Sequence, residues 1–162
     1  LGPNGAGKST LSKHLARERQ AVYLRIDTVE QALRDSGQII RGPEGYMAAY
    51  AVAADNLRLG LSVVADSVNP LKVTRDAWRE VAAQLSVPFV EIEVICSDPI
   101  EQRIRVETRT AEITGFELPT WDDVVRRKYE LWDRAHVVID TAGQTVEQSI
   151  AALQQALTAD TN

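Results

Sequence analysis

The stretch Gly2-Pro3-Asn4-Gly5-Ala6-Gly7-Lys8-Ser9-Thr10 matches the pattern G-x-x-x-x-G-K-[ST], with both glycines, the lysine and the hydroxyl residue in place. In such a loop, consecutive backbone N–H groups converge on phosphate oxygens, and the following helix points its positive end at the anion. Lys8 can neutralise the β- and γ-phosphates, and the Ser9 hydroxyl can ligate Mg²⁺. We therefore expect ATP and Mg²⁺ as cofactors, with the nucleotide bound by Asn4, Gly5, Ala6, Gly7, Lys8, Ser9 and Thr10.

Other interpretations of this stretch fit less well. A glycine-rich turn that only starts a helix would not need these specific residue types at four positions. The dinucleotide-binding pattern G-x-G-x-x-G is not satisfied, because Gly5 and Gly7 are followed by Lys8-Ser9 and no third glycine. The stretch is therefore interpreted as a phosphate-binding loop, or P-loop.

Length and composition indicate one globular domain over residues 1–162, with 44% apolar and 25% charged residues. The formal net charge of −5 argues against a nucleic-acid-binding surface. Cys96 is the only cysteine, which excludes an intrachain disulfide and a cysteine-based zinc cluster. No apolar run is long enough to cross a bilayer, and no signal peptide is visible. We expect a cytoplasmic monomer or homodimer without nucleic-acid or membrane partners.

Predicted strands and helices alternate along the chain. Apolar runs predict strands at 21–26, 61–65, 89–96 and 137–139. Helical patterns with capping residues lie between them, at 8–20, 28–36, 44–59, 70–85, 98–109, 120–134 and 145–157. This alternation predicts a three-layer α/β fold, in which a parallel sheet is covered by helices and the ligand lies at the carboxyl ends of the strands.

A P-loop normally follows a buried strand, but the chain opens on Leu1 immediately before the loop. Without that strand, the sheet would have a slot and two unpaired edges. We therefore expect a first strand of about five residues or more to precede Leu1.

Three predicted strands end at an aspartate: Asp27, Asp66 and Asp140. Carboxylates beside a triphosphate are costly unless they hold Mg²⁺ or accept a proton. Asp27 is a candidate catalytic base for an acceptor hydroxyl, although it could instead only cap the next helix. Asp66 follows an aliphatic run, as in a Walker B element, and with Ser9 is a candidate Mg²⁺ ligand; a turn aspartate is the alternative. Asp140 is interpreted as structural.

Arg105 and Arg109 lie four residues apart on one helical face, ahead of a polar, irregular segment. Phosphoryl transfer gains from a mobile cation that reaches the spreading negative charge and excludes water. We therefore expect a lid at about 103–120, with Arg105 and Arg109 as catalytic residues alongside Lys8 and Asp27. A solvated face paired with neighbouring glutamates is the alternative for either arginine.

Other classes of nucleotide-binding protein have the same loop sequence. Transporter-type (ABC) ATPases need a downstream Leu-Ser-Gly-Gly-Gln signature and a glutamate after the Walker B aspartate, whereas Ser67 follows Asp66 here. A GTPase would need an Asn-Lys-x-Asp motif, which is missing. A non-catalytic or slowly hydrolysing ATP-binding regulator stays open, because it could keep every phosphate contact. Asp27 discriminates between the two, because only a kinase needs a base at that position.

Taken together, these motifs resemble the small P-loop kinases of the nucleoside-monophosphate-kinase-like group. Within that group, the chain looks most like the branch containing gluconate kinases, chloramphenicol phosphotransferase, adenylylsulfate kinases and zeta toxins. The matching features are the P-loop, Asp27, Val63-Val64-Ala65-Asp66, the segment 96–109 and Val138-Ile139-Asp140-Thr141. Segments 105–109 and 118–121 look like a bacterial family labelled only as ATP-binding or kinase-like.

This resemblance implies strand order 2-3-1-4-5, ATP with Mg²⁺, a lid arginine and a substrate-side role for Asp27. The expected function is that of an ATP-dependent kinase, which transfers the γ-phosphate to a hydroxyl of a small molecule. The motifs do not identify that acceptor.

Overall fold

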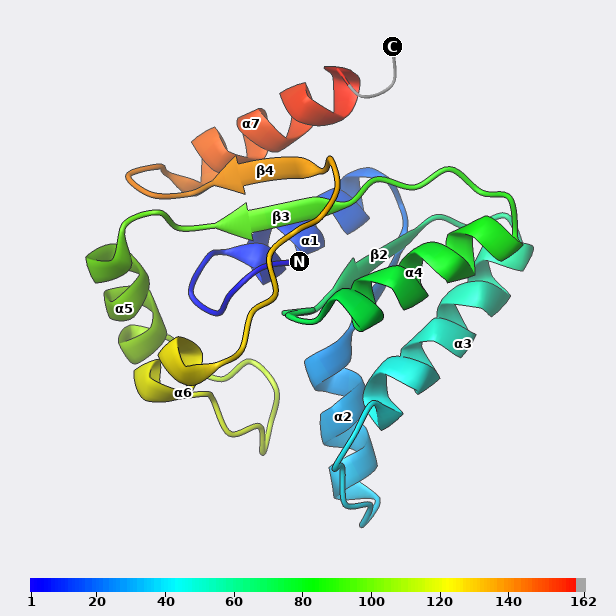
Figure 1. Ribbon diagram of the computed structural model, residues 1–162, viewed down its shortest axis with the longest axis horizontal. Helices are drawn as coiled ribbons and strands as arrows, with labels where there is room; N and C mark the ends of the chain where they lie inside the picture. The colour runs from blue at the N-terminus through cyan, green and yellow to red at the C-terminus, as the bar shows by residue number, and fades with distance from the viewer. Residues whose placement is uncertain (160–162) are drawn as a thin grey trace.

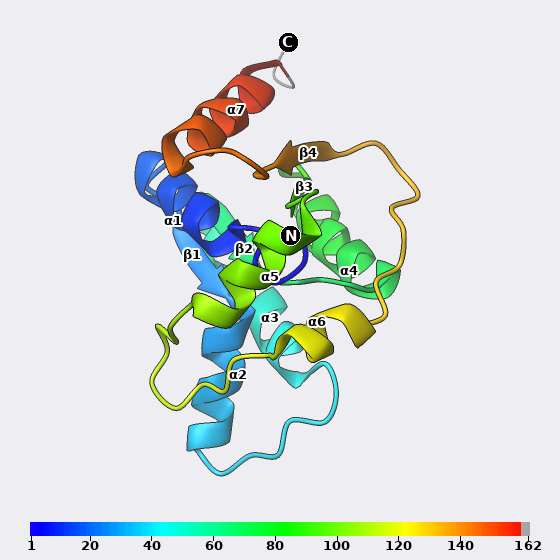
Figure 2. The same cartoon turned by 90° about the vertical axis from the view of Figure 1, so that its left-hand side faces the viewer.

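The computed structural model describes residues 1–159, in which strands and helices alternate along the chain (Figures 1 and 2). The strands are β1 (Val22–Arg25), β2 (Val63–Asp66), β3 (Ile92–Ile95) and β4 (Val137–Asp140). The helices are α1 (Lys8–Glu18), α2 (Ile26–Asp35), α3 (Glu44–Arg58), α4 (Lys72–Gln84), α5 (Pro99–Thr108), α6 (Trp121–Arg126) and α7 (Val146–Ala159). Every predicted element is present, and only the end of α6 lies more than three residues from its predicted position.

The strands form two parallel pairs. In the first, β1 runs beside β2 with Val22 opposite Val63; in the second, β3 runs beside β4 with Ile92 opposite Val137. Parallel strands connected through helices confirm the predicted α/β fold. The two pairs are the neighbours 2-3 and 4-5 of the expected order 2-3-1-4-5. Within residues 1–159 no strand joins β2 to β3, so the complete order stays a prediction.

The P-loop begins between these two pairs. The backbone nitrogen of Leu1 donates to the Ile92 carbonyl at 2.9 Å, and Val94 N–H donates to the Leu1 carbonyl at 2.8 Å. On the other side, Gly2 N–H donates to the Val68 carbonyl, which follows β2. These bonds hold the loop at the carboxyl ends of the strands, where the fold class predicts the ligand.

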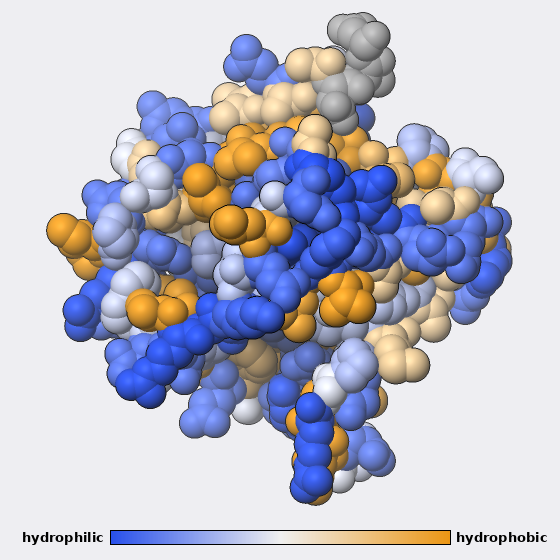
Figure 3. Space-filling model, in the orientation of Figure 1, coloured by the Kyte–Doolittle hydropathy of each residue, from blue (hydrophilic) through white to orange (hydrophobic). Residues whose placement is uncertain are grey.

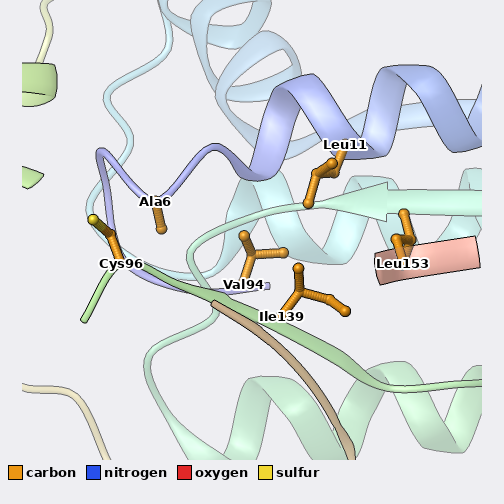
Figure 4. Packing of buried hydrophobic residues seen from close by; sticks show 6 residues of the cluster. All are labelled: Ala6, Leu11, Val94, Cys96, Ile139 and Leu153. Atoms are coloured by element: carbon orange, nitrogen blue, oxygen red, sulfur yellow. The ribbon is translucent and has the colours of Figure 1, made fainter. Parts of the chain in front are cut away.

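A hydrophobic core lies under α1 and α7, which contact each other (Figures 1 and 4). Its buried members come from the P-loop, α1, β3 and its end, β4 and α7: Ala6, Leu11, Val94, Cys96, Ile139 and Leu153. Cys96 is therefore a buried thiol in the core, as its apolar run predicts. On the other side, α3 packs against β1, β2 and α4.

Helix α6 is shorter than predicted, because it ends at Arg126 instead of Arg134. Its start is as expected: Thr120 and Asp123 form a capping box. Beyond Arg126 the chain turns to make long-range contacts, in which Tyr129 donates to the Glu93 carboxylate and Arg134 pairs with Glu91. Such tertiary contacts outweigh local helix propensity, which is a weak determinant.

Helix α5 continues to Thr108, so the irregular part of the predicted lid is 109–120. Asp98 caps α5 by accepting hydrogen bonds from the N–H groups of Ile100 and Glu101. None of the described helices is long and apolar enough to cross a lipid bilayer.

Candidate active site

The P-loop backbone takes a conformation that depends on its glycines. Gly7, the N-cap of α1, has φ 85°, a left-handed value that favours glycine. Gly5 packs against α5 so closely that a Cβ there would lie 2.7 Å from Val106 Cγ2. The loop therefore curves tightly and presents its N–H groups and the N-terminus of α1 on one side.

Lys8 is buried, with 9% of its surface exposed, and its Nζ donates to the Pro3 carbonyl at 3.1 Å. Burial lowers its pKa, while the negative charges of Asp66 and Asp27 act in the opposite direction. Lys8 is thus a partly desolvated cation bonded to its own loop and in the field of both candidate carboxylates. Such a cation is well suited to bind an anion in place of the Pro3 carbonyl oxygen.

Asp66, at the end of β2, is 2% exposed and accepts a hydrogen bond from the Tyr23 hydroxyl at 2.6 Å. The Ser9 side chain is within hydrogen-bonding range of the same hydroxyl, which places Ser9 next to Asp66. Burial and the Asp66 charge raise the pKa of Tyr23, so its proton stays on the oxygen. A hydroxyl and a buried carboxylate held side by side are the hard oxygen donors that Mg²⁺ prefers, so these residues fit the expected ion.

Asp27 does not cap the helix that follows β1. It lies in the first turn of α2, where Arg25 is the N-cap residue. Its carboxylate is 3.8 Å from Arg25 Nε and 39% exposed, so it is accessible to a ligand. Its charge acts on Lys8 and also on Arg109. The structure therefore brings Asp27 to the same rim as the P-loop, as the strand ends predict.

Arg109 lies at the base of the predicted lid, where its Nη2 donates to the Pro119 carbonyl at 2.9 Å. Burial lowers its pKa, and the Asp27 charge opposes that shift. A second cation, Arg127, lies close enough for its charge to lower the pKa of both Arg109 and Lys8. Two arginines, one on either side of α6, therefore act on the charge of Lys8, and Arg109 also lies in the field of Asp27.

Arg105 lies in a different part of the site. Its guanidinium donates to Thr141 Oγ1 at 2.7 Å and to the Thr141 carbonyl at 3.0 Å, and it pairs with Glu101 at 2.6 Å. The Thr141 hydroxyl also bonds the Ala6 carbonyl, so this network ties the loop after β4 to the P-loop. In this structure Arg105 is thus bonded to the loop after β4, and Arg109 is the predicted arginine nearer to Asp27.

The lid segment is tied to the body of the molecule by Glu112. Its carboxylate contacts Lys13 of α1 and pairs with Arg25 of β1 at 2.9 Å. Beneath the segment lies a cavity of about 480 Å³, here named the P-loop cavity. It is lined on one side by the P-loop and α1, on another by the lid, and on a third by residues 141–149. Its size is that of a small-molecule site.

Two residues near the site, Tyr23 and Arg127, are not marked by any motif in the sequence. Tyr23 lies inside a predicted strand, where a tyrosine is ordinarily a packing residue, and only the pairing of β1 with β2 brings it to Asp66. Arg127 was assigned to the middle of a long helix. Its position follows from the early end of α6, for which the sequence has no glycine or proline signal.

The comparisons with known proteins agree with this geometry. A family model described as an AAA domain matches residues 1–131. No curated protein matches the sequence. A gluconokinase from Sinorhizobium meliloti 1021 is 17% identical with a TM-score of 0.67, over 98% of this chain and 89% of that one.

Two further solved structures are similar. The APS kinase CysC of Mycobacterium tuberculosis, in complex with AMPPNP and APS, is 18% identical with a TM-score of 0.67, over 98% of this chain and 94% of that one. Kti12 of Chaetomium thermophilum, in complex with ADP-AlF3, is 18% identical with a TM-score of 0.68, over 96% of each chain. At these identities the similarity establishes the fold, which is that of P-loop kinases.

Proposed function

Since the chain belongs to the AAA domain family, we propose that it is an ATP-dependent kinase that transfers the γ-phosphate of ATP to a hydroxyl of a small molecule. The observation that carries this proposal is the accessible carboxylate of Asp27 in the shared field of Lys8 and Arg109. A module that only binds ATP needs no carboxylate there, whereas a kinase needs one to handle the acceptor proton. Two of the similar structures are named as kinases of small molecules, which supports the same class.

In this proposal the P-loop N–H groups and Lys8 hold the phosphates. Arg105 and residues 141–149 are on the side of the P-loop cavity that suits the base and sugar. Ser9 and Asp66 would hold Mg²⁺, which would neutralise part of the negative charge of the phosphates. The Tyr23 hydroxyl would restrain the Asp66 carboxylate through its hydrogen bond to Oδ2.

The chemical step is an in-line displacement. The acceptor oxygen forms a bond to the γ-phosphorus, the bond from that phosphorus to the β,γ-bridging oxygen breaks, and ADP leaves. Asp27 accepts the acceptor's hydroxyl proton, while Arg109 and Lys8 stabilise the negative charge that spreads over the transferred group. The lid, tied down by Glu112, would keep water from competing as the acceptor.

The test is a phosphotransfer screen over sugars, sugar acids, nucleosides and aromatic alcohols with γ-labelled ATP. For an acceptor that is used, Asp27→Asn should lower kcat by about 10²- to 10⁴-fold while the Kd for ATP stays within about twofold. Asp55→Asn removes a carboxylate that is 77% exposed and paired only locally with Arg58, so it is the matched control. Slow ATP hydrolysis alone, unchanged by Asp27→Asn, would replace the kinase proposal with an ATP-binding regulator.

A further inference from the structure

A second cavity, of about 620 Å³, lies on the other side of the P-loop and is here named the α6 cavity. Pro3 and Asn4 line it, whereas Gly5 and Lys8 line the P-loop cavity, so the loop separates the two. Its remaining walls come from β3 and its end, α5, α6, the segment 127–132 and Val68, the second residue after β2. A cavity of this size can enclose a small molecule.

The walls of the α6 cavity are mainly aromatic and aliphatic: Val68, Ile95, Trp121, Val124, Val125 and Leu131 line it. Glu93 is the carboxylate among its lining residues, and both of its oxygens are engaged: Oε1 by Tyr129 at 2.8 Å and Oε2 by His136 at 3.1 Å. Figure 3 shows hydrophobic surface interspersed with hydrophilic surface on the side where Figure 1 places α5 and α6. The cavity thus suits an apolar body more than a polyol.

Two side-chain polar atoms of residues lining the cavity, Asn4 Oδ1 and Trp132 Nε1, are buried without a hydrogen-bond partner in the part of the chain that the structure describes. Asn4 is 9% exposed, and its Oδ1 is buried without a hydrogen bond. An unpaired buried carbonyl oxygen is costly unless a ligand donates to it. The Asn4 backbone is held in place by Gln102 Nε2, which donates to its carbonyl at 2.8 Å. The cavity therefore offers a fixed acceptor for an O–H or N–H group of a ligand.

Arg127 connects the α6 cavity to the reacting groups. It lines the cavity, and its charge acts on both Lys8 and Arg109. Arg109 in turn lies in the field of Asp27. A molecule in the α6 cavity can therefore lie beside the P-loop on the side away from the P-loop cavity and extend a hydroxyl along Arg127 toward Asp27.

We propose that the α6 cavity holds the body of the phosphoryl acceptor, and that this acceptor is a compact, mostly apolar alcohol bearing a second hydrogen-bond donor for Asn4. This inference rests on the proposed kinase function and adds the substrate class. A sugar acid or a nucleotide would bring several hydroxyl or anionic groups into walls that offer only Arg127 as a cation.

Binding is tested separately from catalysis. The protein has three tryptophans, and Trp78→Phe leaves Trp121 and Trp132, which both line the α6 cavity. In that background, 1-phenylpropane-1,3-diol should change the tryptophan emission in a saturable way, and sodium gluconate should not.

Val125→Glu puts a carboxylate on a cavity residue that is 63% exposed, and should weaken diol binding about tenfold or more. Ile104→Glu, at a 55% exposed position of α5 outside both cavities, should leave it within twofold.

Phosphotransfer to the same two probes completes the test. The expected result is transfer to the diol, with KM for the diol raised by Val125→Glu while KM for ATP is unchanged. Gluconate phosphorylation with no diol binding would overturn the cavity assignment and leave the kinase proposal standing. Diol binding that Val125→Glu weakens, without transfer to any alcohol in the screen, would keep the cavity as a ligand site and overturn the kinase proposal. Diol binding that is equally insensitive to Val125→Glu and Ile104→Glu would place the ligand elsewhere.

Discussion

At the scale of single residues, the contact between Tyr23 and Asp66 is the least expected feature of the site. The hydroxyl donates to Asp66 Oδ2 at 2.6 Å and lies beside Ser9. A carboxylate that is 2% exposed needs such a donor, because an unpartnered buried charge is costly. We therefore interpret Tyr23 as a positioning residue, which acts through its hydrogen bond to Asp66, the residue that would hold Mg²⁺.

Tyr23→Phe removes this hydrogen bond and leaves the ring in place. We expect Mg²⁺ to increase ATP affinity less in the variant, by about fivefold, because a hydrogen bond of about 1 kcal/mol no longer orients Asp66. The measurement is the Kd for ATP with Mg²⁺ and with EDTA, which needs no turnover. A purely structural role would change both Kd values by the same factor. If the ratio of the Kd with EDTA to the Kd with Mg²⁺ is the same in the variant and the wild type, the positioning role is refuted.

Lys8→Ala tests the P-loop itself. Removing the buried ammonium should weaken ATP binding by about 100-fold or more, because the β- and γ-phosphates lose a desolvated cation. Isothermal titration with ATP measures the loss. Lys128→Ala, at a side chain that is 79% exposed, should bind ATP as the wild type does. Equal affinity of the two variants would refute the assignment of the loop, under the kinase and the regulator interpretation alike.

At the scale of elements, the predicted lid segment 109–120 lines the P-loop cavity, and helix α6 lines the α6 cavity. The segment is irregular and is tethered to α1 and β1 through Glu112, which contacts both Lys13 and Arg25. Hydrogen bonding and charge from these two residues lower the pKa of Glu112. Because the folded-state pKa is depressed, the tether is complete above the ordinary glutamate pKa and is lost as the pH falls through the lowered value.

Nucleotide release should report on this tether. We expect Glu112→Gln to speed ATP dissociation about two- to fivefold at neutral pH, since exposed pairs contribute modestly. Wild-type dissociation should approach the variant's rate only in acid, below the ordinary glutamate pKa. Stopped-flow displacement of a fluorescent ATP analogue measures both rates. Glu117→Gln, at an exposed position in the same segment, is the control, and equal neutral-pH rates for wild type and Glu112→Gln would contradict the tether.

At the scale of the whole molecule, two packed parts meet at the P-loop. One part joins α1 and α7 to β3 and β4 through the hydrophobic core, and in the other α3 packs against α4, β1 and β2; α1 also contacts β1 and β2 and so connects the two parts. Site residues come from both, since Asp27 follows β1 and Asp66 ends β2, whereas Arg105 and Thr141 follow β3 and β4. The relative position of the two parts therefore determines the geometry of the site.

Leu153→Ala tests how far the core supports this arrangement. Leu153 is 2% exposed, and its truncation should lower the free energy of unfolding by about 2–5 kcal/mol through lost burial and a residual cavity. Urea denaturation measures the change. Leu59→Ala, at a position that is 76% exposed, should change it by less than about 0.5 kcal/mol. Comparable losses in the two variants would show that this core does not carry the stability.

The sequence by itself determined the α/β fold, the P-loop and the position of Asp27 at the same rim as the loop. These follow from local rules: a glycine pattern, the alternation of strands and helices, and the common rim of parallel strand ends. Only the tertiary structure decided that α6 ends at Arg126, that Arg127 lines a cavity together with Pro3 and Asn4 of the P-loop, and that Tyr23 donates to Asp66. The physical reason is that each of these depends on contacts between residues tens of positions apart, which outweigh local propensity and have no periodic signal in the chain.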